Sequence, residues 1–257
     1  MYLQYCEKVP TAIGKGILTR FVGKRHRYAE YCIGNLKIEL NPVALLDRYL
    51  IEGTDINPVL SKEMECHLRP NDVFIDIGAN IGFFSILAEK RYHAEVFSFE
   101  PSARELARFY RNAALNHCQK ITCFPYAVGS SEETLYLSLT GEDNPSMNHV
   151  VRVKSNNEEE VNVRTIPSLI PPARLEKAAI CKIDVEGFEM EVLEGLREIM
   201  GSLKKCRFVV EVSPDYLKKN GAEVSQMYDF FRSYGYKALY GKQDAFQWDE
   251  VFYYGND

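Results

Sequence analysis

From about residue 70 onward, short runs of apolar residues alternate with longer segments in which apolar and polar residues are mixed. Apolar runs of this length are typical of strands that are buried on both faces, as in a parallel sheet. The runs predict strands at Val73–Ile77, Glu95–Phe99, 121–128, 179–184 and 208–212.

The segments between these runs carry two other patterns. Apolar residues at helical spacing predict helices at 83–90, 102–117, 188–200 and 223–234. Alternation of polar and apolar residues predicts exposed strands at 135–139, 150–153 and 161–164, and a closing hairpin at 236–240 and 251–254. Because strands alternate with helices, the fold class is α/β, a sheet with helices on both faces and its loops gathered along one edge.

The helix predicted at 102–117 has the clearest pattern. Ser102, with Glu105 three residues later, has the spacing of a capping box. The face expected to pack on the sheet consists of Leu106, Phe109, Tyr110, Ala113 and Ala114.

Two segments lie outside this repeating pattern. Residues 1–69 carry short apolar runs broken by glycines, and they predict an N-terminal extension packed on a main domain of residues 70–257. The basic residues of 15–27 form either a solvated face or a contact for an anionic acceptor. Residues 140–160 are polar and turn-rich, which predicts an inserted β-hairpin and a mobile flap over an acceptor site.

A glycine-containing turn follows the first predicted strand, with the sequence Asp76-Ile77-Gly78-Ala79-Asn80-Ile81-Gly82. Gly78 permits a sharp turn and a close approach to the backbone, and Asn80 tolerates a left-handed conformation. Glu100 comes about 20 residues after Gly78, at the end of the next strand, where an acid can accept hydrogen bonds from both ribose hydroxyls.

Two adenosine cofactors compete for such a turn. A dinucleotide site would require glycine at positions 80 and 83, where this chain has Asn80 and Phe83. S-adenosylmethionine has no phosphate. Its site needs the turn, an acidic residue that binds the ribose and a hydrogen-bond acceptor for its amino acid end. Asp76 is the candidate acceptor, directly or through water. The pattern favours a methyltransferase over a dinucleotide enzyme or a turn without catalytic meaning.

Four segments together resemble the FkbM methyltransferase family: FIDIGANIG at 74–82, FEP at 99–101, AVG at 127–129 and KIDVEGFE at 182–189. The resemblance covers about residues 70 to 213. It implies a Rossmann-like methyltransferase sheet, mostly parallel, with an antiparallel last strand from the terminal hairpin. It also implies methyl transfer from S-adenosylmethionine, usually to a hydroxyl of a sugar or secondary metabolite. The predicted cofactor site comprises Asp76, Gly78, Ala79, Asn80, Ile81, Gly82, Glu100, Pro101 and Ala127.

The candidate catalytic residues lie on the later strands. Asp184 ends a predicted strand and is either a general base or substrate-orienting carboxylate, or an N-cap or turn acid for the following helix. Lys182 shares its strand face and is placed to pair with Asp184 or Glu211. Glu211 is a candidate for binding the acceptor, and His149 for a base brought in by loop closure. Glu186 and Glu189 are interpreted as helix-start carboxylates.

Composition restricts the remaining possibilities. No His, Cys and acid set has metal-ligand spacing, so no metal is expected. The formal net charge of -5 offers no general attraction to nucleic acid, which counts against a nucleic acid methyltransferase. No apolar run is long enough to span a bilayer, and none resembles a signal peptide, which predicts a cytoplasmic protein. The expected partner is a small-molecule or carbohydrate acceptor, anionic and lipid-linked ones included. The alternative is a non-catalytic Rossmann-like binding protein.

Overall fold

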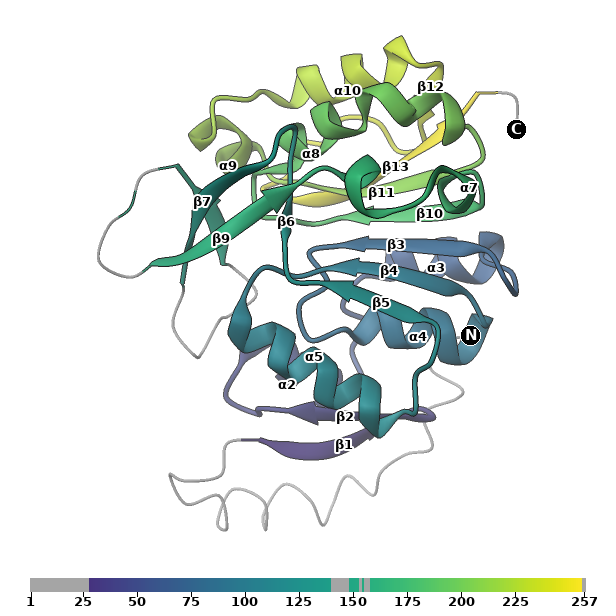
Figure 1. Ribbon diagram of the computed structural model, residues 1–257, viewed down its shortest axis with the longest axis vertical. Helices are drawn as coiled ribbons and strands as arrows, with labels where there is room; N and C mark the ends of the chain where they lie inside the picture. Colours follow the sequence, from purple (N-terminus) through teal and green to yellow (C-terminus); the bar gives the residue numbers. More distant parts are fainter. Residues whose placement is uncertain (1–27, 140–147, 153, 155–157, 256–257) are drawn as a thin grey trace.

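A seven-stranded sheet forms the centre of the computed structural model, which describes residues 28–139, 148–152, 154 and 158–255 (Figure 1). Its strand order is β12-β13-β11-β10-β3-β4-β5, and every neighbouring pair is parallel except those made by β13. The predicted α/β class and the antiparallel last strand are therefore confirmed. The strands are β3 (Val73–Ile77), β4 (Glu95–Phe99), β5 (Ile121–Phe124), β10 (Ala178–Ile183), β11 (Arg207–Val212), β12 (Tyr236–Ala238) and β13 (Trp248–Tyr254).

The order of the strands reverses between β3 and β10. From β3 the chain continues outward to β4 and β5, whereas from β10 it continues in the opposite direction to β11. Ligands of open α/β sheets bind beyond the carboxyl ends of the strands at such a reversal, because the connecting helices diverge there. The glycine turn follows β3 and Asp184 follows β10, so both stand at this point.

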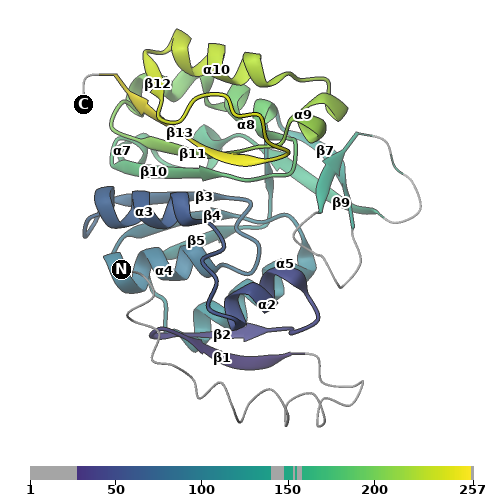
Figure 2. The same cartoon turned by 180° about the vertical axis from the view of Figure 1, so that it is seen from behind.

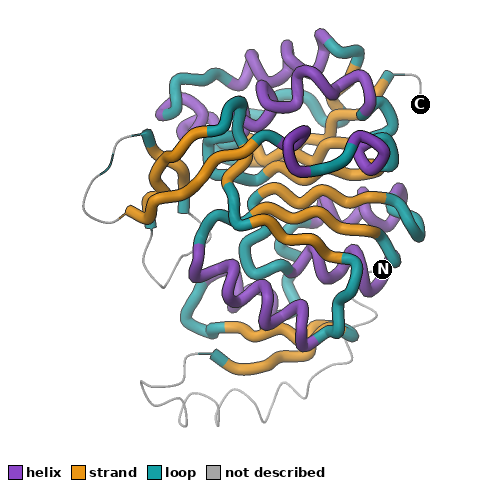
Figure 3. The backbone as a smooth tube through the Cα atoms, viewed as in Figure 1, coloured by secondary structure: helices purple, strands orange, loops and turns teal. Residues whose placement is uncertain are grey.

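Helices cover both faces of the sheet, as Figures 1 and 2 show from opposite sides and Figure 3 shows by element type. Alternate strand residues point to opposite faces, so that Phe74 joins one core and Ile75 the other. On one face lie α6 (Ile166–Leu169), α7 (Pro172–Leu175), α8 (Glu189–Leu196), the 3-10 helix η3 (Arg197–Ser202) and α10 (Val224–Ser233). On the other face lie α3 (Pro58–His67) and α4 (Phe83–Tyr92).

A second, four-stranded sheet stands beside the carboxyl ends of the main sheet, with the order β6-β9-β7-β8 (Figure 1). The single strand predicted at 121–128 was wrong. Pro125 has no N–H for a ladder, and the chain leaves the main sheet there before Ala127 pairs with β9. The strands are β6 (Ala127–Val128), β7 (Glu133–Ser138), β8 (His149–Val151) and β9 (Glu158–Arg164).

The flap predicted at 140–160 falls partly outside the described residues, which exclude 140–147, 153 and 155–157. The described remainder contains β8 and the first part of β9, which do not form a hairpin with each other, because each pairs antiparallel with β7 from opposite sides. Motion of this segment stays a prediction.

Helix α5 (Ala103–Leu115) buries Phe109 as predicted, but most of the face that it buries is polar rather than apolar. Tyr110 is 50% exposed, whereas Arg108 and Asn112 are buried. The Asn112 side chain accepts a hydrogen bond from the backbone N–H of Glu39 at 2.7 Å, and Arg108 pairs with Asp47. These partners belong to β2 (Leu36–Leu40) and α2 (Leu45–Ile51), whose sequence pattern gave no sign of the contact.

The capping box predicted at the start of α5 does not form. The Ser102 side chain makes no cap hydrogen bond, and its backbone N–H donates to Glu100 instead. Glu105 pairs with Arg104 and Arg108, so its carboxylate is not free to reach back to the helix end.

The described part of the predicted extension, residues 28–69, consists of the hairpin β1 (Ala29–Ile33) and β2, followed by α2 and α3. Leu60 and Met64 of α3 join the core that covers one face of the main sheet. The division into an extension and a main domain stays a prediction, and the basic residues of 15–27 lie outside the described residues. Within the described chain, no helix is both long and apolar enough to cross a membrane.

Candidate active site

A cavity of about 470 Å³ opens beyond the carboxyl ends of β3, β4, β10 and β11. Its lining includes all of the predicted cofactor residues except Asp76 and Gly82, and it includes all three predicted catalytic residues. The second sheet contributes Leu137 and Val150. The cavity thus collects the sequence candidates in one place. The predicted residues that line it are Gly78, Ala79, Asn80, Ile81, Glu100, Pro101, Ala127, Lys182, Asp184 and Glu211.

The turn after β3 needs glycine at two positions for packing as well as for backbone conformation. Gly78 has φ 79°, and a Cβ there would lie 1.8 Å from the carbonyl oxygen of Asp184. Gly82 has φ 82°, and a Cβ there would lie 2.6 Å from the ring of Phe109. Asn80 adopts the left-handed conformation expected of it, with φ 51°. The close contact at Gly78 joins the turn directly to the end of β10.

Glu100 is held by the backbone of the site. Its two carboxylate oxygens accept hydrogen bonds from the N–H groups of Asn80 and Ser102, each at 2.8 Å. Each oxygen keeps a further lone pair, so the group can also receive the two hydroxyls of a ribose. Burial raises the pKa of Glu100 to about 7, against the effect of the two N–H donors. These contacts fit the cofactor that the sequence predicted.

Asp76 lies beneath the turn and does not line the cavity. Its carboxylate accepts a hydrogen bond from Ser85 at 2.5 Å, and one of its oxygens lies 3.6 Å from the ammonium of Lys182. Burial raises its pKa despite the nearby ammonium. Asp76 therefore contacts Lys182, which lines the cavity, but it does not line the cavity itself. Its predicted role as a hydrogen-bond acceptor for the cofactor stays a prediction.

Lys182 connects the two sides of the cavity. Its ammonium donates to the carbonyl of Gly78 at 2.8 Å and lies 3.1 Å from an oxygen of Asp184. Burial opposes the charge, but the carboxylates of Asp184 and Asp76 outweigh this effect and raise the pKa of Lys182 above its usual range. These carboxylates thus favour the charged form of Lys182, and the predicted pairing with Asp184 is present.

Asp184 faces the cavity at the end of β10. Its side chain is 30% exposed, and its backbone N–H donates to the carbonyl of Ile77 at 3.1 Å. The N-cap of α8 is Phe188, so the alternative of Asp184 as the cap of that helix is wrong. The carboxylate is thus fixed in place by Lys182 and the strand, and open on its other side.

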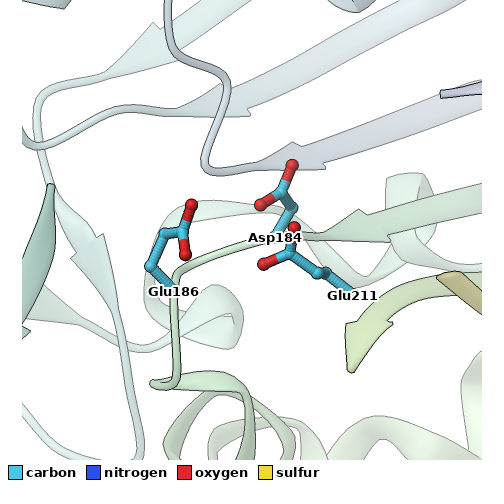
Figure 4. Close-up of side chains that lie close together, drawn as sticks. All are labelled: Asp184, Glu186 and Glu211. Carbon is cyan, nitrogen blue, oxygen red and sulfur yellow. The ribbon is translucent and has the colours of Figure 1, made fainter. Parts of the chain in front are cut away.

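Three carboxyl groups gather beyond β10 and β11, from Asp184, Glu186 and Glu211 (Figure 4). One oxygen from each lies within 4.8 Å of the others. Burial raises the pKa of Glu186 to about 8, with a further contribution from the negative charge of Asp184. Burial and the same charge also raise the pKa of Glu211 well above its usual range. We call Asp184, Glu186 and Glu211 the acidic cluster.

Glu186 and Glu189 have different roles, although the sequence treated them alike. Glu189 accepts hydrogen bonds from the N–H groups of Val185 and Gly187, so it stabilises the loop before α8. Glu186 has φ 54°, and this unusual backbone directs its side chain to the cavity. A left-handed backbone at a glutamate has no signal in the sequence.

The structure adds cavity residues that the sequence did not suggest. Asp249 of β13 accepts a hydrogen bond from Asn57 at 2.9 Å, and Gln247 donates to one oxygen of Glu211. Leu46 and Tyr49 of α2 supply an apolar wall. These residues come from the chain ends, and only the folded chain brings them to the site. His149 lies in β8 near Tyr216 and does not line the cavity.

A mostly parallel sheet with one antiparallel strand, a glycine turn after its central strand and a buried acid at the end of the next define a Rossmann-like methyltransferase. The chain belongs to the family described as the methyltransferase FkbM domain, which matches residues 76–238. It is a methyltransferase that depends on S-adenosylmethionine, and the predicted cofactor is confirmed.

Several curated proteins are similar to this chain. It is 28% identical over 183 residues to "Methyltransferase 1" of Beauveria bassiana, covering 63% of this chain and 72% of that protein. It is 28% identical over 163 residues to methyltransferase sdnD of Sordaria araneosa, covering 51% and 63%. It is 28% identical over 158 residues to hexuronic acid methyltransferase AglP of Haloferax volcanii, covering 61% and 60%. The matches thus span less than two thirds of sdnD and of AglP.

Two solved structures have more distant similarity. TYW2 of M. jannaschii in complex with AdoMet has a TM-score of 0.46 at 12% identity, covering 89% of this chain and 85% of that one. A putative rRNA-methylase from Clostridium thermocellum has a TM-score of 0.48 at 9% identity, covering 78% and 97%.

Proposed function

We propose that this protein transfers the methyl group of S-adenosylmethionine to a hydroxyl of a carbohydrate or a similar hydroxylated small molecule. The observation that carries the proposal is Asp184, a carboxylate held by Lys182 at 3.1 Å and open to the cavity on the other side. It lies against the glycine turn, since the Gly78 backbone touches its carbonyl. We expect a base in this position to lie near both the cofactor and the acceptor.

The chemistry requires a positioned acceptor and a place for its proton. The cofactor supplies a methyl group on a sulfonium, which is already a good leaving group. The bond between the acceptor oxygen and the methyl carbon forms while the bond from carbon to sulfur breaks, and its electron pair stays on sulfur. The proton of the hydroxyl passes to Asp184. A positioned base of this kind contributes roughly 10²–10⁴-fold, and alignment of the reacting atoms contributes more.

Lys182 and Glu211 support this step from two sides. Lys182 holds one oxygen of Asp184, so the carboxylate keeps its orientation as the proton arrives. Glu211 lines the acceptor side of the cavity and is a candidate to receive a second acceptor hydroxyl. The cofactor side consists of the glycine turn, Glu100, Pro101 and Ala127.

The charge of the acidic cluster and the name of one relative, AglP, both bear on the class of acceptor. The negative charge of Asp184 disfavours a second negative group beside it, so any acidic group of the acceptor lies away from the acidic cluster. AglP bears the name of a hexuronic acid methyltransferase, which supports a sugar acceptor with its hydroxyls near the cluster. The apolar wall from Leu46 and Tyr49 suits the less polar face of a sugar ring or an aglycone.

The test is methyl transfer to a matched set of acceptors. The full chain is incubated with S-adenosylmethionine and hexuronic acids, their glycosides, the corresponding deoxy sugars and amino sugars, and the product is located by NMR. We expect an O-methyl ether that is lost when one particular hydroxyl is absent. Methylation of nitrogen alone, with no ether from any hydroxylated acceptor, would falsify the proposal.

A further inference from the structure

Within the acidic cluster, Asp184 is paired with Lys182, whereas the other two carboxyl groups are not paired in this way. Glu186 and Glu211 have no ion-pair partner among the residues that the structure describes. Lys182 is engaged with the Gly78 carbonyl, Asp184 and Asp76 on the other side of the cluster. Carboxylates kept this close together require a positive partner or a proton.

Glu211 supplies an independent sign that something binds here. The residue is only 8% exposed, and its Oε1 accepts a hydrogen bond from Gln247. Its Oε2 is buried and has no hydrogen-bond partner. A buried carboxylate oxygen without a donor is costly, because it has given up water and received nothing in exchange. This oxygen belongs to a carboxyl group that faces Asp184 and Glu186 (Figure 4).

We propose that Asp184, Glu186 and Glu211 form a binding site for one divalent cation of the magnesium or manganese class, on the acceptor side of the cavity. Three carboxylate oxygens within 4.8 Å of one another can converge on a single ion. Oxygen-only ligands select hard cations, and three protein ligands leave positions for water or for acceptor oxygens. The site departs from the absence of a metal expected from the sequence, because its ligands come from two strands and a left-handed residue.

The role of this cation rests on the proposed function. Two neighbouring hydroxyls of an acceptor take two of its remaining coordination positions, which fixes the reacting oxygen beside Asp184. Coordination also makes the hydroxyl more acidic, as it does for metal-bound water. The proton still passes to a carboxylate of the cluster, and the bonds made and broken at the methyl carbon are those already described.

The deciding experiment is a Mn²⁺ titration of the full chain, stripped with chelator and followed by electron paramagnetic resonance. We expect one bound Mn²⁺ per chain, displaced by Mg²⁺. Glu186→Gln and Glu211→Gln should each weaken Mn²⁺ binding on the order of tenfold or more. Glu194→Gln is the matched control, because Glu194 lies on α8 in an exposed pair with Arg197. It should bind Mn²⁺ like the natural chain.

Absence of Mn²⁺ binding to the natural chain overturns the proposal, as does binding that neither cluster variant weakens. The first measurement needs no variant, so it decides the matter even if Glu211→Gln fails to fold. Binding of S-adenosylhomocysteine by calorimetry verifies that each variant keeps its cofactor side. Failure of the O-methylation test with Mn²⁺ binding intact would remove the proposed function and leave the cation site.

Discussion

The two halves of the sheet's carboxyl edge both present buried carboxylates, but they satisfy them differently. On the cofactor half, Glu100 receives two backbone N–H donors, one from the turn after the neighbouring strand β3 and one from the start of α5. On the acceptor half, Glu186 and Glu211 face Asp184 and one another, and one oxygen of Glu211 has no donor. A carboxylate whose hydrogen bonds come from the backbone can accept further hydrogen bonds from neutral hydroxyls. A group of carboxylates without enough donors must instead bind a cation or be protonated.

The largest expected effect lies on the acceptor half. Asp184→Asn keeps the shape of the side chain but removes the base, so kcat should fall by roughly 10²–10⁴-fold while cofactor affinity is kept. Single-turnover kinetics with the true acceptor measures this, and calorimetry with S-adenosylhomocysteine measures the affinity. Asp229→Asn, in an exposed pair with Arg232 on α10, is the control. Near-normal turnover in Asp184→Asn would direct the search for a base to Glu211, which also lines the cavity.

The second effect concerns the residue between the two halves. Lys182→Met removes the ammonium from Asp76 and leaves a buried carboxylate without its partner. Breaking such a pair costs about 3–5 kcal/mol of unfolding free energy. Urea denaturation should show this loss, and Lys218→Met, at an exposed site on α9 (Pro214–Lys219), should show none. Equal stability of the two variants would contradict the role assigned to Lys182.

A smaller effect belongs to the cofactor half. Glu100→Gln removes the charge that strengthens hydrogen bonds from the ribose hydroxyls, so S-adenosylhomocysteine should bind about 1–3 kcal/mol more weakly. Titration calorimetry measures this difference. Glu95→Gln changes the same residue type at the other end of β4, in a pair with Arg174, and should leave the affinity unchanged. An unchanged affinity in Glu100→Gln would show that Glu100 does not bind the ribose hydroxyls.

The smallest effect is a pH dependence of cofactor binding. The pKa of Glu100 is raised to about 7, so the group is protonated at pH 6 and ionised at pH 8. The ionised form is the better acceptor, and the affinity for S-adenosylhomocysteine should therefore rise about tenfold across that interval. Glu189 and Asp249 titrate in a similar range, with pKa values of about 7 and about 6. The comparison with Glu100→Gln isolates Glu100, because only its own part of the pH profile disappears in the variant.

The pH dependence of stability runs the other way for the free protein. The pKa of Glu100 is higher in the folded state than in an unfolded chain, so folding favours the protonated form. Its contribution to stability is fully present below the usual pKa of a glutamate and is lost as the pH rises through about 7. In Glu100→Gln, the free energy of unfolding should therefore decrease less as the pH rises. Denaturation at several pH values measures this difference.

The main sheet could be predicted from the sequence where burial alone decided the structure. β3 and β4 are buried apolar runs, and their predicted bounds are those of the structure. The face of α5 could not be predicted, because Arg108 and Asn112 are buried by partners from α2 and β2. Tertiary contacts that satisfy polar groups leave no hydrophobic pattern to detect.

The candidate site shows the same division. The turn and Glu100 could be found because their spacing along the chain reflects one strand, one turn and one helix. Glu186 could not, since its direction depends on a left-handed backbone. Asp249 and Gln247 could not either, because it is the long-range pairing of β13 with β11 that brings this part of the chain to the site. The residues that sequence reasoning missed lie mostly on the acceptor side.

The ammonium of Lys182 touches the Gly78 carbonyl on one side and Asp184 on the other, so neither half can change its charge without the other responding. Thermodynamic linkage makes that response reciprocal. The factor by which S-adenosylmethionine alters the affinity of the acceptor side for its ligand must equal the factor by which that ligand alters the affinity for S-adenosylmethionine. The contacts of this one buried lysine thus link the glycine turn to Asp184.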